Sequence, residues 1–517
     1  MKDFWSERAR WGVPLQRAPI RNYPSLLGMA KSRDLYETGL PRGALLPRLT
    51  ADRERMSNWM SPGSLLRHRI RPGQLVIGKL GDTFLGHLDD RPMLTIAGAR
   101  SGKSSTVLKP NLYLYSGSML VLDPKGELAA ETAALRRAMG HQVHVVDAFG
   151  QSGERSACFN CLEVLDPDDP RIIDQVMSIV SALVPDQGGG GNAKHFNDSA
   201  RALLVGIILF VLAMPDKQER HLVTVRKLLT LSYEPLARAA ENAAAKVRTQ
   251  AQAKGQTSHV DASTFAVQIL LNSIILLGGR FGGVAASIGA RFLNMPPVER
   301  GSVFSTAAVH TDFLDSLLLR RIIKHSDFKL ESLRSDRPTT IYLVLPVAEL
   351  ERQFRFLRLI VQMACTTLER LGSFPPGKQP VLFVMEEFAV LGHMKIMEQA
   401  AAYFPGFGVK LWIVLQSLQQ LINDYRTSYQ TILGNAGLVQ MFAAGDDPAL
   451  QYAASWLGKL MDHSEMRQAF SRDRRSQLLL MEGEPPAAAM RLEHEDVALI
   501  RRRVEESIRR NNHLSLQ

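Results

Sequence analysis

The sequence predicts an α/β fold in which a parallel central sheet is interrupted by an all-helical block. From residue 92 onward, short apolar segments alternate with helix-like stretches, which is typical of buried parallel strands covered by helices. Between residues 166 and 297 this alternation gives way to long helical stretches, and it resumes after residue 298. Because strands lie on both sides of the helical block, the α/β domain must be discontinuous in sequence.

The first part of the sheet is predicted from three short apolar runs. Each run is bounded by a charged or small residue, and helix-like stretches separate them. The expected strands are 93–97, 119–123 and 143–147, and the expected helices are 103–115 and 128–139.

The helical block and the second part of the sheet follow the same logic. Five stretches in the block have the periodicity of amphipathic or buried helices: 172–183, 199–213, 223–231, 234–254 and 263–277. Apolar runs then predict four further strands, at 340–346, 381–385, 410–415 and 437–443.

These patterns divide the chain into four parts. The first is a basic N-terminal arm with a small β-containing segment, and the last is a tail that carries a helix. The boundaries are 1–85 for the arm, 86–165 and 298–480 for the discontinuous α/β domain, 166–297 for the all-α domain and 481–517 for the C-terminal tail.

Composition and charge limit the class of protein. With 517 residues, 45% hydrophobic and 22% charged, the chain is neither fibrous nor wholly disordered. The net charge is +11, and residues 1–110 carry nearly all of it, with 19 Lys and Arg against 9 Asp and Glu. This basic segment, which also holds Trp5, Trp11, Tyr23 and Trp59, could contact phosphate backbones or anionic lipid headgroups. A solvated arm lying on the body of the protein is the alternative.

The number of cysteines and the length of the apolar runs predict the cellular compartment of the protein. Three cysteines cannot form a disulfide framework, which indicates a reducing compartment. Cys158 and Cys161 form a CxxC pair, but no second pair or neighbouring histidine completes a zinc site, so we interpret them as ordinary strand or loop residues. No secretory signal is present, and the longest uncharged apolar run, 202–214, is shorter than the roughly 20 residues of a spanning helix. We therefore expect no transmembrane segment in this chain.

Residues 97–105 predict a phosphate-binding P-loop. The segment reads Ala-Gly-Ala-Arg-Ser-Gly-Lys-Ser-Ser, with Ala97 where the motif has its first glycine. In such a loop the backbone N–H groups converge on phosphates at the start of a helix. Lys103 is expected to pair with the β- and γ-phosphates, and the Ser104 hydroxyl to ligate Mg²⁺. The predicted nucleotide-binding residues are Gly98, Ala99, Arg100, Ser101, Gly102, Lys103, Ser104 and Ser105.

Two carboxylates follow the apolar strand at 381–385. We expect this strand to lie one strand from the P-loop strand, with Glu386 holding Mg²⁺ through water and Glu387 polarising the attacking water as the catalytic base. Asp is the usual residue at the first position, and the longer side chain of Glu386 leaves the metal geometry open. A surface acidic pair is the alternative, although it fits poorly after so apolar a run.

Gln416 follows the strand at 410–415. A polar side chain at the end of a strand beside the site can sense the γ-phosphate, so we predict a catalytic role for Gln416. A loop glutamine without function is the alternative.

Four motifs resemble those of the coupling proteins of type IV secretion and conjugation, the TraG/TraD-type ATPases. They occur in the family's order, and the resemblance spans roughly residues 60–460. The P-loop with Arg-Ser-Gly-Lys-Ser is followed by Val-Leu-Asp-Pro-Lys-Gly-Glu at 121–127, Glu-Phe-Ala-Val-Leu-Gly at 387–392 and Gln-Ser-Leu-Gln-Gln-Leu at 416–421. Weaker agreement comes from His-Phe-Asn at 195–197, Ser-Asp-Phe at 326–328 and Ser-Trp-Leu-Gly at 455–458.

The resemblance implies a RecA-like P-loop nucleotide-binding domain interrupted by an all-α domain, and a Mg²⁺-dependent ATPase. Such proteins are homo-hexameric rings that deliver single-stranded DNA–relaxase complexes or protein effectors to the channel components of the inner membrane. Nucleotide then lies between subunits and the all-α domain receives substrate. A trans-acting arginine is expected in such rings. Arg300 and Arg426 are weak candidates for it, because no motif identifies either residue.

The family usually begins with two membrane-spanning helices, which this chain does not have. It is therefore a shortened chain or a member recruited through partners, and in either case we expect it in the bacterial cytoplasm, peripheral to the inner membrane. The basic front end suits the membrane surface.

Two other functions stay open. A HerA/FtsK-type translocase on duplex DNA is disfavoured by the Asp-Pro-Lys-Gly-Glu run at 123–127 and by the helical insertion. A catalytically silent, nucleotide-gated cargo adaptor is kept open by Ala97 and Glu386, which depart from the usual motifs.

Overall fold

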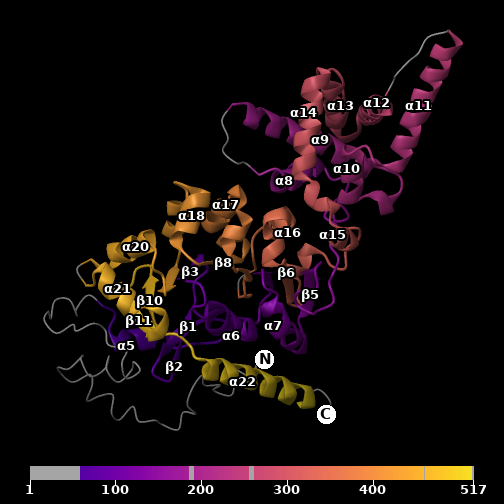
Figure 1. Ribbon diagram of the computed structural model, residues 1–517. Coiled ribbons are helices and arrows are strands. Elements are labelled where there is room, and N and C mark those ends of the chain that lie inside the picture. The colour runs from indigo at the N-terminus through magenta and orange to yellow at the C-terminus, as the bar shows by residue number, and fades with distance from the viewer. Residues whose placement is uncertain (1–58, 186–190, 255–260, 376, 459, 515–517) are drawn as a thin grey trace, which may run out of the picture.

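The computed structural model describes residues 59–185, 191–254, 261–375, 377–458 and 460–514, and Figure 1 shows their arrangement. A sheet with helices on both faces forms the body, and a block of helices projects from one end of it. Trp5, Trp11 and Tyr23 of the predicted basic segment lie outside the described residues, as do its arginines before residue 59. Trp59 is described, and it is 7% exposed, so its ring is part of the core and does not face a partner.

Eleven strands form one sheet in the order β2-β1-β11-β10-β9-β3-β8-β7-β4-β6-β5. The seven strands from β9 to β5 are parallel, which confirms the predicted parallel sheet. The strands are β1 (Leu75–Leu80), β2 (Thr83–His87), β3 (Met93–Ala97), β4 (Met119–Asp123), β5 (Gln142–Asp147), β6 (Thr339–Val344), β7 (Val381–Met385), β8 (Val409–Leu415), β9 (Leu438–Phe442), β10 (Ser476–Met481) and β11 (Ala487–Met490).

Four antiparallel strands extend the sheet beyond β9. The predicted tail supplies β11 and the end of β10, and the predicted N-terminal segment supplies β1 and most of β2. The two ends of the described chain therefore meet in one edge of the sheet, where Lys79 of β1 is paired with Met490 of β11. No pattern in the sequence predicted this extension.

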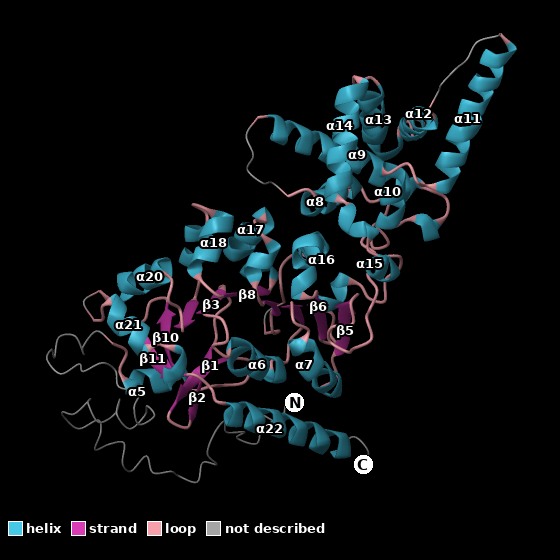
Figure 2. Ribbon diagram, viewed as in Figure 1, coloured by secondary structure: helices cyan, strands magenta, loops and turns pink. Residues whose placement is uncertain are grey.

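Alternate residues of each central strand bury against different helices, as the two-residue period of a strand requires. Leu94 and Ile96 of β3 belong to the core beneath α16, α17, α18 and α20, whereas Met93 and Ala97 pack with α6 and α7 (Figure 2). Both layers exclude water, which is why these strands are apolar throughout. The helices are α5 (Pro62–Leu65), α6 (Lys109–Leu114), α7 (Glu127–Ala138), α16 (Leu350–Arg370), α17 (Lys395–Tyr403), α18 (Leu418–Tyr425), α19 (Tyr429–Gly434), α20 (Asp447–Leu457), α21 (His463–Ala469) and α22 (His494–Leu514).

The helical block is built around α9. This helix contacts α8, α10, α12, α13 and α14, and α8 in turn packs on α16 of the body. The block comprises α8 (Ile172–Leu183), α9 (Asn192–Ala213), α10 (Leu222–Leu229), α11 (Glu234–Ala253), α12 (Ala262–Ile275), α13 (Val284–Leu293), α14 (Pro297–His310) and α15 (Leu317–Ile322).

The apolar run expected at 202–214 is the second half of a longer helix, α9. Within the described part of the chain, α9 is the one helix whose length and composition would allow it to cross a membrane, with a mean hydropathy of 1.7 over its most apolar window. Of that window, 61% is buried within the protein. Its apolar side chains are therefore accounted for by packing inside the helical block.

The division into domains stays a prediction, and the packing bears on two of its boundaries. α14, which was expected to belong to the α/β domain, packs along α9. We therefore propose that the helical block ends after α15 and not at residue 297. Residues 481–514 contribute a strand of the sheet and α22, which packs on α6, so they are part of the body.

Candidate nucleotide-binding site

The predicted P-loop connects β3 to the helix that follows it. The loop turns through two left-handed residues, Arg100 with φ 56° and Gly102 with φ 87°. The chain then winds as a π-helical turn over Lys103–Leu108 before it continues as α6. The curvature places the start of the helix over the end of β3, which is the arrangement that an anion-binding loop needs.

Ala97 and Gly98 have different structural demands. Ala97 is the last residue of β3, is fully buried and is in register with Phe442 of β9, so a methyl group fits at this departure from the motif. Gly98 allows no side chain, because a Cβ atom there would lie 2.4 Å from the carbonyl oxygen of Ala443. The close approach of the residue after β9 therefore requires glycine at 98 and not at 97.

The two predicted Mg²⁺ residues are in contact. The Ser104 hydroxyl donates a hydrogen bond to Oε1 of Glu386, across 282 positions of sequence. Glu386 is 4% exposed, and burial raises the pKa of its carboxyl, while the Ser104 hydrogen bond and the charges of Lys103 and Lys125 oppose that rise. The structure thus brings a hydroxyl, a carboxylate and two ammonium groups together at the end of the sheet.

Glu387 is held in an unusual backbone conformation and by two amides. Its φ is 58°, in the left-handed region that non-glycine residues seldom occupy and that is often found at functional sites. Gln416 Nε2 donates to Oε2 of Glu387 at 2.7 Å, and Gln420 Nε2 donates to Oε1 at 3.2 Å. Both carboxylate oxygens are therefore fixed by side chains that follow β8.

Gln420 was not among the predicted site residues. Its Oε1 also accepts hydrogen bonds from the backbone N–H groups of Gln416 and Ser417, at 2.9 and 3.3 Å. With Ser417 it forms a capping box at the start of α18. The Ser-x-x-Gln spacing is a sequence signal for such a cap and could have identified this residue.

The strand order differs from the expected one. β8 lies between β3 and β7, so the strand that carries Glu386 and Glu387 is two strands from the P-loop strand and not one. Gln416, at the end of β8, consequently lies on the strand between the P-loop and the carboxylates. Apolar runs predict that strands are buried but carry no information on their lateral order, which explains the error.

Asp123 adds a buried carboxyl at the end of β4, the other neighbour of β7. It is fully buried, and burial raises its pKa to about 7, with a further contribution from the charge of Glu386. Its Oδ2 accepts a hydrogen bond from Ala129 N at 2.8 Å, while Oδ1 has no hydrogen-bond partner among the described atoms. The sequence supplied this residue only as part of a family motif.

A pocket of about 360 Å³ opens beside the P-loop. Arg100, Ser101, Gly102, Ser105 and Thr106 line one side, and Arg472, Asp473, Arg475 and residues 491–495 of the predicted tail line the other. Arg491 is the buried link between the two sides, at 6% exposed. It donates hydrogen bonds to the carbonyl oxygens of Ser101 and Arg472, and its guanidinium lies over the Phe442 ring.

Arg358 links the segment after Glu387 to the helical block. This buried residue of α16 donates to the carbonyl oxygens of Leu391 and His393, the latter at 2.8 Å, and to that of Ala182 in α8 at 3.2 Å. A single side chain thus contacts both the turn that follows the predicted catalytic carboxylate and the helix that connects the body to the block.

The two candidate arginines for a trans-acting role lie in the helical block and directly after α18. Arg300 lies on α14 and donates to the carbonyl oxygens of Phe292 and Leu293, so it caps α13 in the helical block. Arg426 directly follows α18, at the opposite end of that helix from Gln416, with φ 47°.

Sequence comparisons identify related proteins. The family model described as "Type IV secretory system Conjugative DNA transfer" matches residues 64–461. The conjugal transfer protein TraG of Escherichia coli is 26% identical over 345 residues, which cover 65% of this chain and 50% of that protein. The protein VirD4 of Rhizobium rhizogenes is 24% identical over 436 residues, or 79% of this chain and 59% of the relative. This chain spans about half the length of the curated relatives that it matches first.

Solved structures share the fold. The plasmid coupling protein TrwB in complex with the non-hydrolysable ATP analogue ADPNP aligns with a TM-score of 0.59 and 14% identity, over 84% of this chain and 92% of that one. TrwB in complex with ADP and Mg²⁺ gives a TM-score of 0.58 with 15% identity over the same shares. The likeness confirms the predicted fold class, a RecA-like P-loop domain interrupted by an all-α domain.

Proposed function

Because this chain belongs to the type IV secretory system conjugative DNA transfer family, we propose that it is the ATP-driven coupling motor of such a system. The observation that carries the proposal is the contact of Ser104 with Glu386, next to a Glu387 held by Gln416 and Gln420. A phosphate-binding loop, a metal-binding pair and a fixed base at one edge of a sheet are the parts that NTP hydrolysis needs.

The P-loop is the proposed site of ATP. TrwB, which shares the fold, was solved with an ATP analogue and with ADP and Mg²⁺. In this chain, Gly98 to Ser105 would surround the phosphates and Lys103 would pair with the β- and γ-phosphates. The pocket lined by Arg100 and Arg491 offers space next to the loop for the remainder of the nucleotide.

The residues at the end of β7 fit a magnesium site. The Ser104 hydroxyl and the Glu386 carboxylate are hard oxygen donors, as Mg²⁺ prefers, and they already lie within hydrogen-bond distance of each other. Mg²⁺ would supply charge neutralisation at the phosphates. Ser104 would hold it directly and Glu386 through water.

Glu387 is the proposed base. Its carboxylate would accept a proton from the attacking water, and the two amides would keep both oxygens in place for that step. Because Gln416 lies on the strand next to β3, it is suited to couple occupation of the P-loop to the position of Glu387. Arg358 would carry a change in the turn after Glu387 to α8 of the helical block.

Cargo and assembly belong to the same proposal. We propose that a homo-hexamer in the bacterial cytoplasm, peripheral to the inner membrane, delivers single-stranded DNA with its relaxase, or protein effectors, to the channel components. The family match and the basic charge of residues 1–110 support this assignment. Contacts to DNA would be mostly to phosphates and independent of sequence.

The family match also bears on the two alternatives. A HerA/FtsK-type duplex translocase would belong to another family, and the family described above covers residues 64–461. A silent adaptor was suggested by Ala97 and Glu386. Ala97 packs inside β3, and Glu386 reaches the Ser104 hydroxyl, so neither departure disrupts the site.

The decisive experiment measures ATP turnover with Mg²⁺ and either no DNA, single-stranded DNA or duplex DNA, with the particle mass determined in each condition. Turnover that single-stranded DNA stimulates more than duplex DNA, in a particle of several subunits, supports the coupling motor. Stimulation by duplex DNA alone supports the translocase. Nucleotide binding without turnover in every condition, including with candidate protein cargo, supports the adaptor and overturns the motor.

A further inference from the structure

The chain passes twice between the sheet and the helical block, and the two passages lie side by side. The first passage follows β5 and the second precedes β6. Phe159 N donates to Ile322 O at 2.7 Å, and Asp327 N donates to Cys158 O at 3.0 Å. Cys158 N in turn donates to Oδ2 of Asp327 at 2.8 Å. These hydrogen bonds hold residues 158 and 327 in fixed positions relative to each other.

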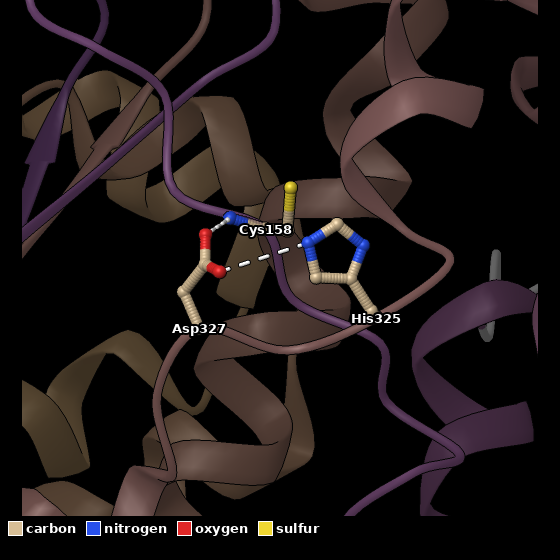
Figure 3. Close-up of side chains that lie close together, drawn as sticks. All are labelled: Cys158, His325 and Asp327. Carbon is tan, nitrogen blue, oxygen red and sulfur yellow. Dashed lines mark hydrogen bonds and ion pairs between the residues drawn. The ribbon is translucent and has the colours of Figure 1, made fainter.

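Three different metal-binding side chains meet at this point. The Sγ of Cys158, the imidazole of His325 and the carboxylate of Asp327 come within 4.8 Å of one another. Figure 3 shows how these three side chains face one another. His325 Nε2 and Asp327 Oδ1 are 3.6 Å apart. In the sequence analysis, Cys158 had no histidine nearby, because the partner follows 167 residues later, beyond the helical block.

We propose that Cys158, His325 and Asp327 bind one Zn²⁺ ion, with water as the fourth ligand. A thiolate, an imidazole and a carboxylate are together the donor set of zinc, whereas Mg²⁺ and Ca²⁺ select oxygen ligands alone. The proposal concerns the link between sheet and block and does not depend on the proposed ATPase activity.

The distances suit a tetrahedral ion. Zinc bond lengths of about 2.0 Å to oxygen or nitrogen and 2.3 Å to sulfur imply donor-to-donor distances of roughly 3.3 to 3.6 Å. The His325–Asp327 distance of 3.6 Å already meets this condition. The thiol must approach by about 1.3 Å at most, since the donor atoms lie within 4.8 Å, and a rotation about χ1 provides such a movement.

The surroundings leave the three donor atoms available. The Asp327 carboxylate uses Oδ2 for the Cys158 N–H group, which orients Oδ1 towards His325. The Cys158 thiol has a long contact, 3.9 Å, with the carbonyl oxygen of Arg321, and it also hydrogen-bonds to the carboxylate of Asp327, the second proposed ligand. The His325 and Asp327 side chains are 61% and 47% exposed, so an ion can enter from solvent and keep a water ligand.

Bound zinc would link the two passages through metal–ligand bonds, which are stronger than the hydrogen bonds that already join them. Its ligands come from both passages, so the ion would restrict rotation of the helical block relative to the sheet. A site with three protein ligands and water is also more readily emptied than a closed four-ligand structural site.

Cobalt spectroscopy tests the proposal on the full chain without a polyhistidine tag. Co²⁺ substitutes for Zn²⁺, and a bound thiolate gives a charge-transfer band in the near ultraviolet. The other two cysteines, Cys161 and Cys365, are buried in the core, so the band reports Cys158. We expect one equivalent of Co²⁺ to produce this band together with tetrahedral visible bands, and one equivalent of Zn²⁺ to abolish both.

Variants assign the ligands. Cys158→Ser should remove the charge-transfer band, and His325→Gln and Asp327→Asn should each weaken Co²⁺ binding at least tenfold, while the exposed His463→Gln serves as the control with unchanged binding. Circular dichroism establishes that each variant is folded. A spectrum without a thiolate band in the unaltered protein, or an unchanged band in His325→Gln and Asp327→Asn, overturns the proposal.

Discussion

The side-chain amide of Gln416 donates a hydrogen bond to Oε2 of Glu387 at 2.7 Å. The two residues follow different strands, β8 and β7, and are separated by 29 positions in sequence. Because β8 lies between β7 and the P-loop strand β3, this hydrogen bond connects the proposed base to the strand next to β3. The contact joins two residues that the sequence places at the ends of different strands.

Glu387→Gln should bind ATP with nearly unchanged affinity and lose turnover. The amide cannot accept a proton from water, so a loss of at least about 10²-fold in kcat is expected, in line with the contribution of general-base catalysis. Turnover is measured by phosphate release and binding by a fluorescent ATP analogue. Glu351→Gln, at an exposed position of α16, is the matched control. Normal turnover in Glu387→Gln would show that another group is the base.

Gln420→Ala should lower kcat by about tenfold. It removes one of the two amide donors to Glu387 and the capping box of α18, each of which contributes about 1 kcal/mol. Gln419→Ala is the neighbouring control, since Gln419 is exposed and its side-chain amide donates to Asn423 within the same helix. Steady-state kinetics that separate kcat from KM check the prediction. Equal kcat values in the two variants would contradict a role for Gln420 in holding Glu387.

Gly98→Ala should destabilise the protein and impair nucleotide binding. The added methyl group would lie 2.4 Å from the Ala443 carbonyl oxygen, a backbone atom that cannot move without displacing the end of β9. We expect a loss of about 1–3 kcal/mol, as for other overpacked positions, and a lower Tm in thermal unfolding. Gly301→Ala, which has open space around it in α14, should instead leave the Tm unchanged or raise it slightly.

Arg491→Ala should weaken ATP binding about tenfold, although residue 491 lies outside the segment that the family model matches. The guanidinium supports the P-loop by donating to the Ser101 carbonyl, and its loss leaves that buried oxygen unpaired. Titration with a fluorescent nucleotide measures the effect. Arg509→Ala, at an exposed position of α22, is the control, and identical affinities in the two variants would exclude this supporting role.

Asp123→Asn should make the protein more stable than the unaltered chain above pH 7. It should also change how the stability depends on pH below pH 7. Burial raises the pKa of Asp123 to about 7 from 3.8, so the folded state binds a proton that the unfolded state releases. Stability from this group is therefore lost as the pH rises from about 4 to 7. The asparagine oxygen can still accept the Ala129 N–H. Urea unfolding at pH 5.5 and 8 checks this, and parallel pH profiles in both proteins would refute it.

The central strands were predicted closely because their environment is uniform. The runs at 93–97, 119–123 and 381–385 coincide with β3, β4 and β7, whose residues are all buried. A strand covered on both faces must be apolar along its whole length, so its ends are visible in the sequence. The P-loop residues and the pair Glu386 and Glu387 were predicted from their positions directly after these strands. They were expected to lie together because parallel strands end at the same edge of a sheet.

Other elements depend on partners that are distant in sequence. β11 reads Ala-Ala-Ala-Met, which by propensity favours a helix, and it is a strand because β10 and β1 supply hydrogen bonds on both sides. Cys158 and His325 are likewise brought together only because the chain leaves and re-enters the sheet at neighbouring points.

The sequence by itself determined which strands are buried, where the proposed phosphate-binding loop lies and which carboxylates end a strand, because burial and backbone curvature select residue types locally. Only the tertiary structure decided that β8 separates the loop from the carboxylates, that Gln420 and Arg491 support the site, and that the chain ends complete the sheet. These relationships arise from hydrogen bonds and packing between segments up to several hundred residues apart. The Ser-x-x-Gln spacing indicates that Gln420 caps a helix, but no local pattern shows that it also contacts Glu387.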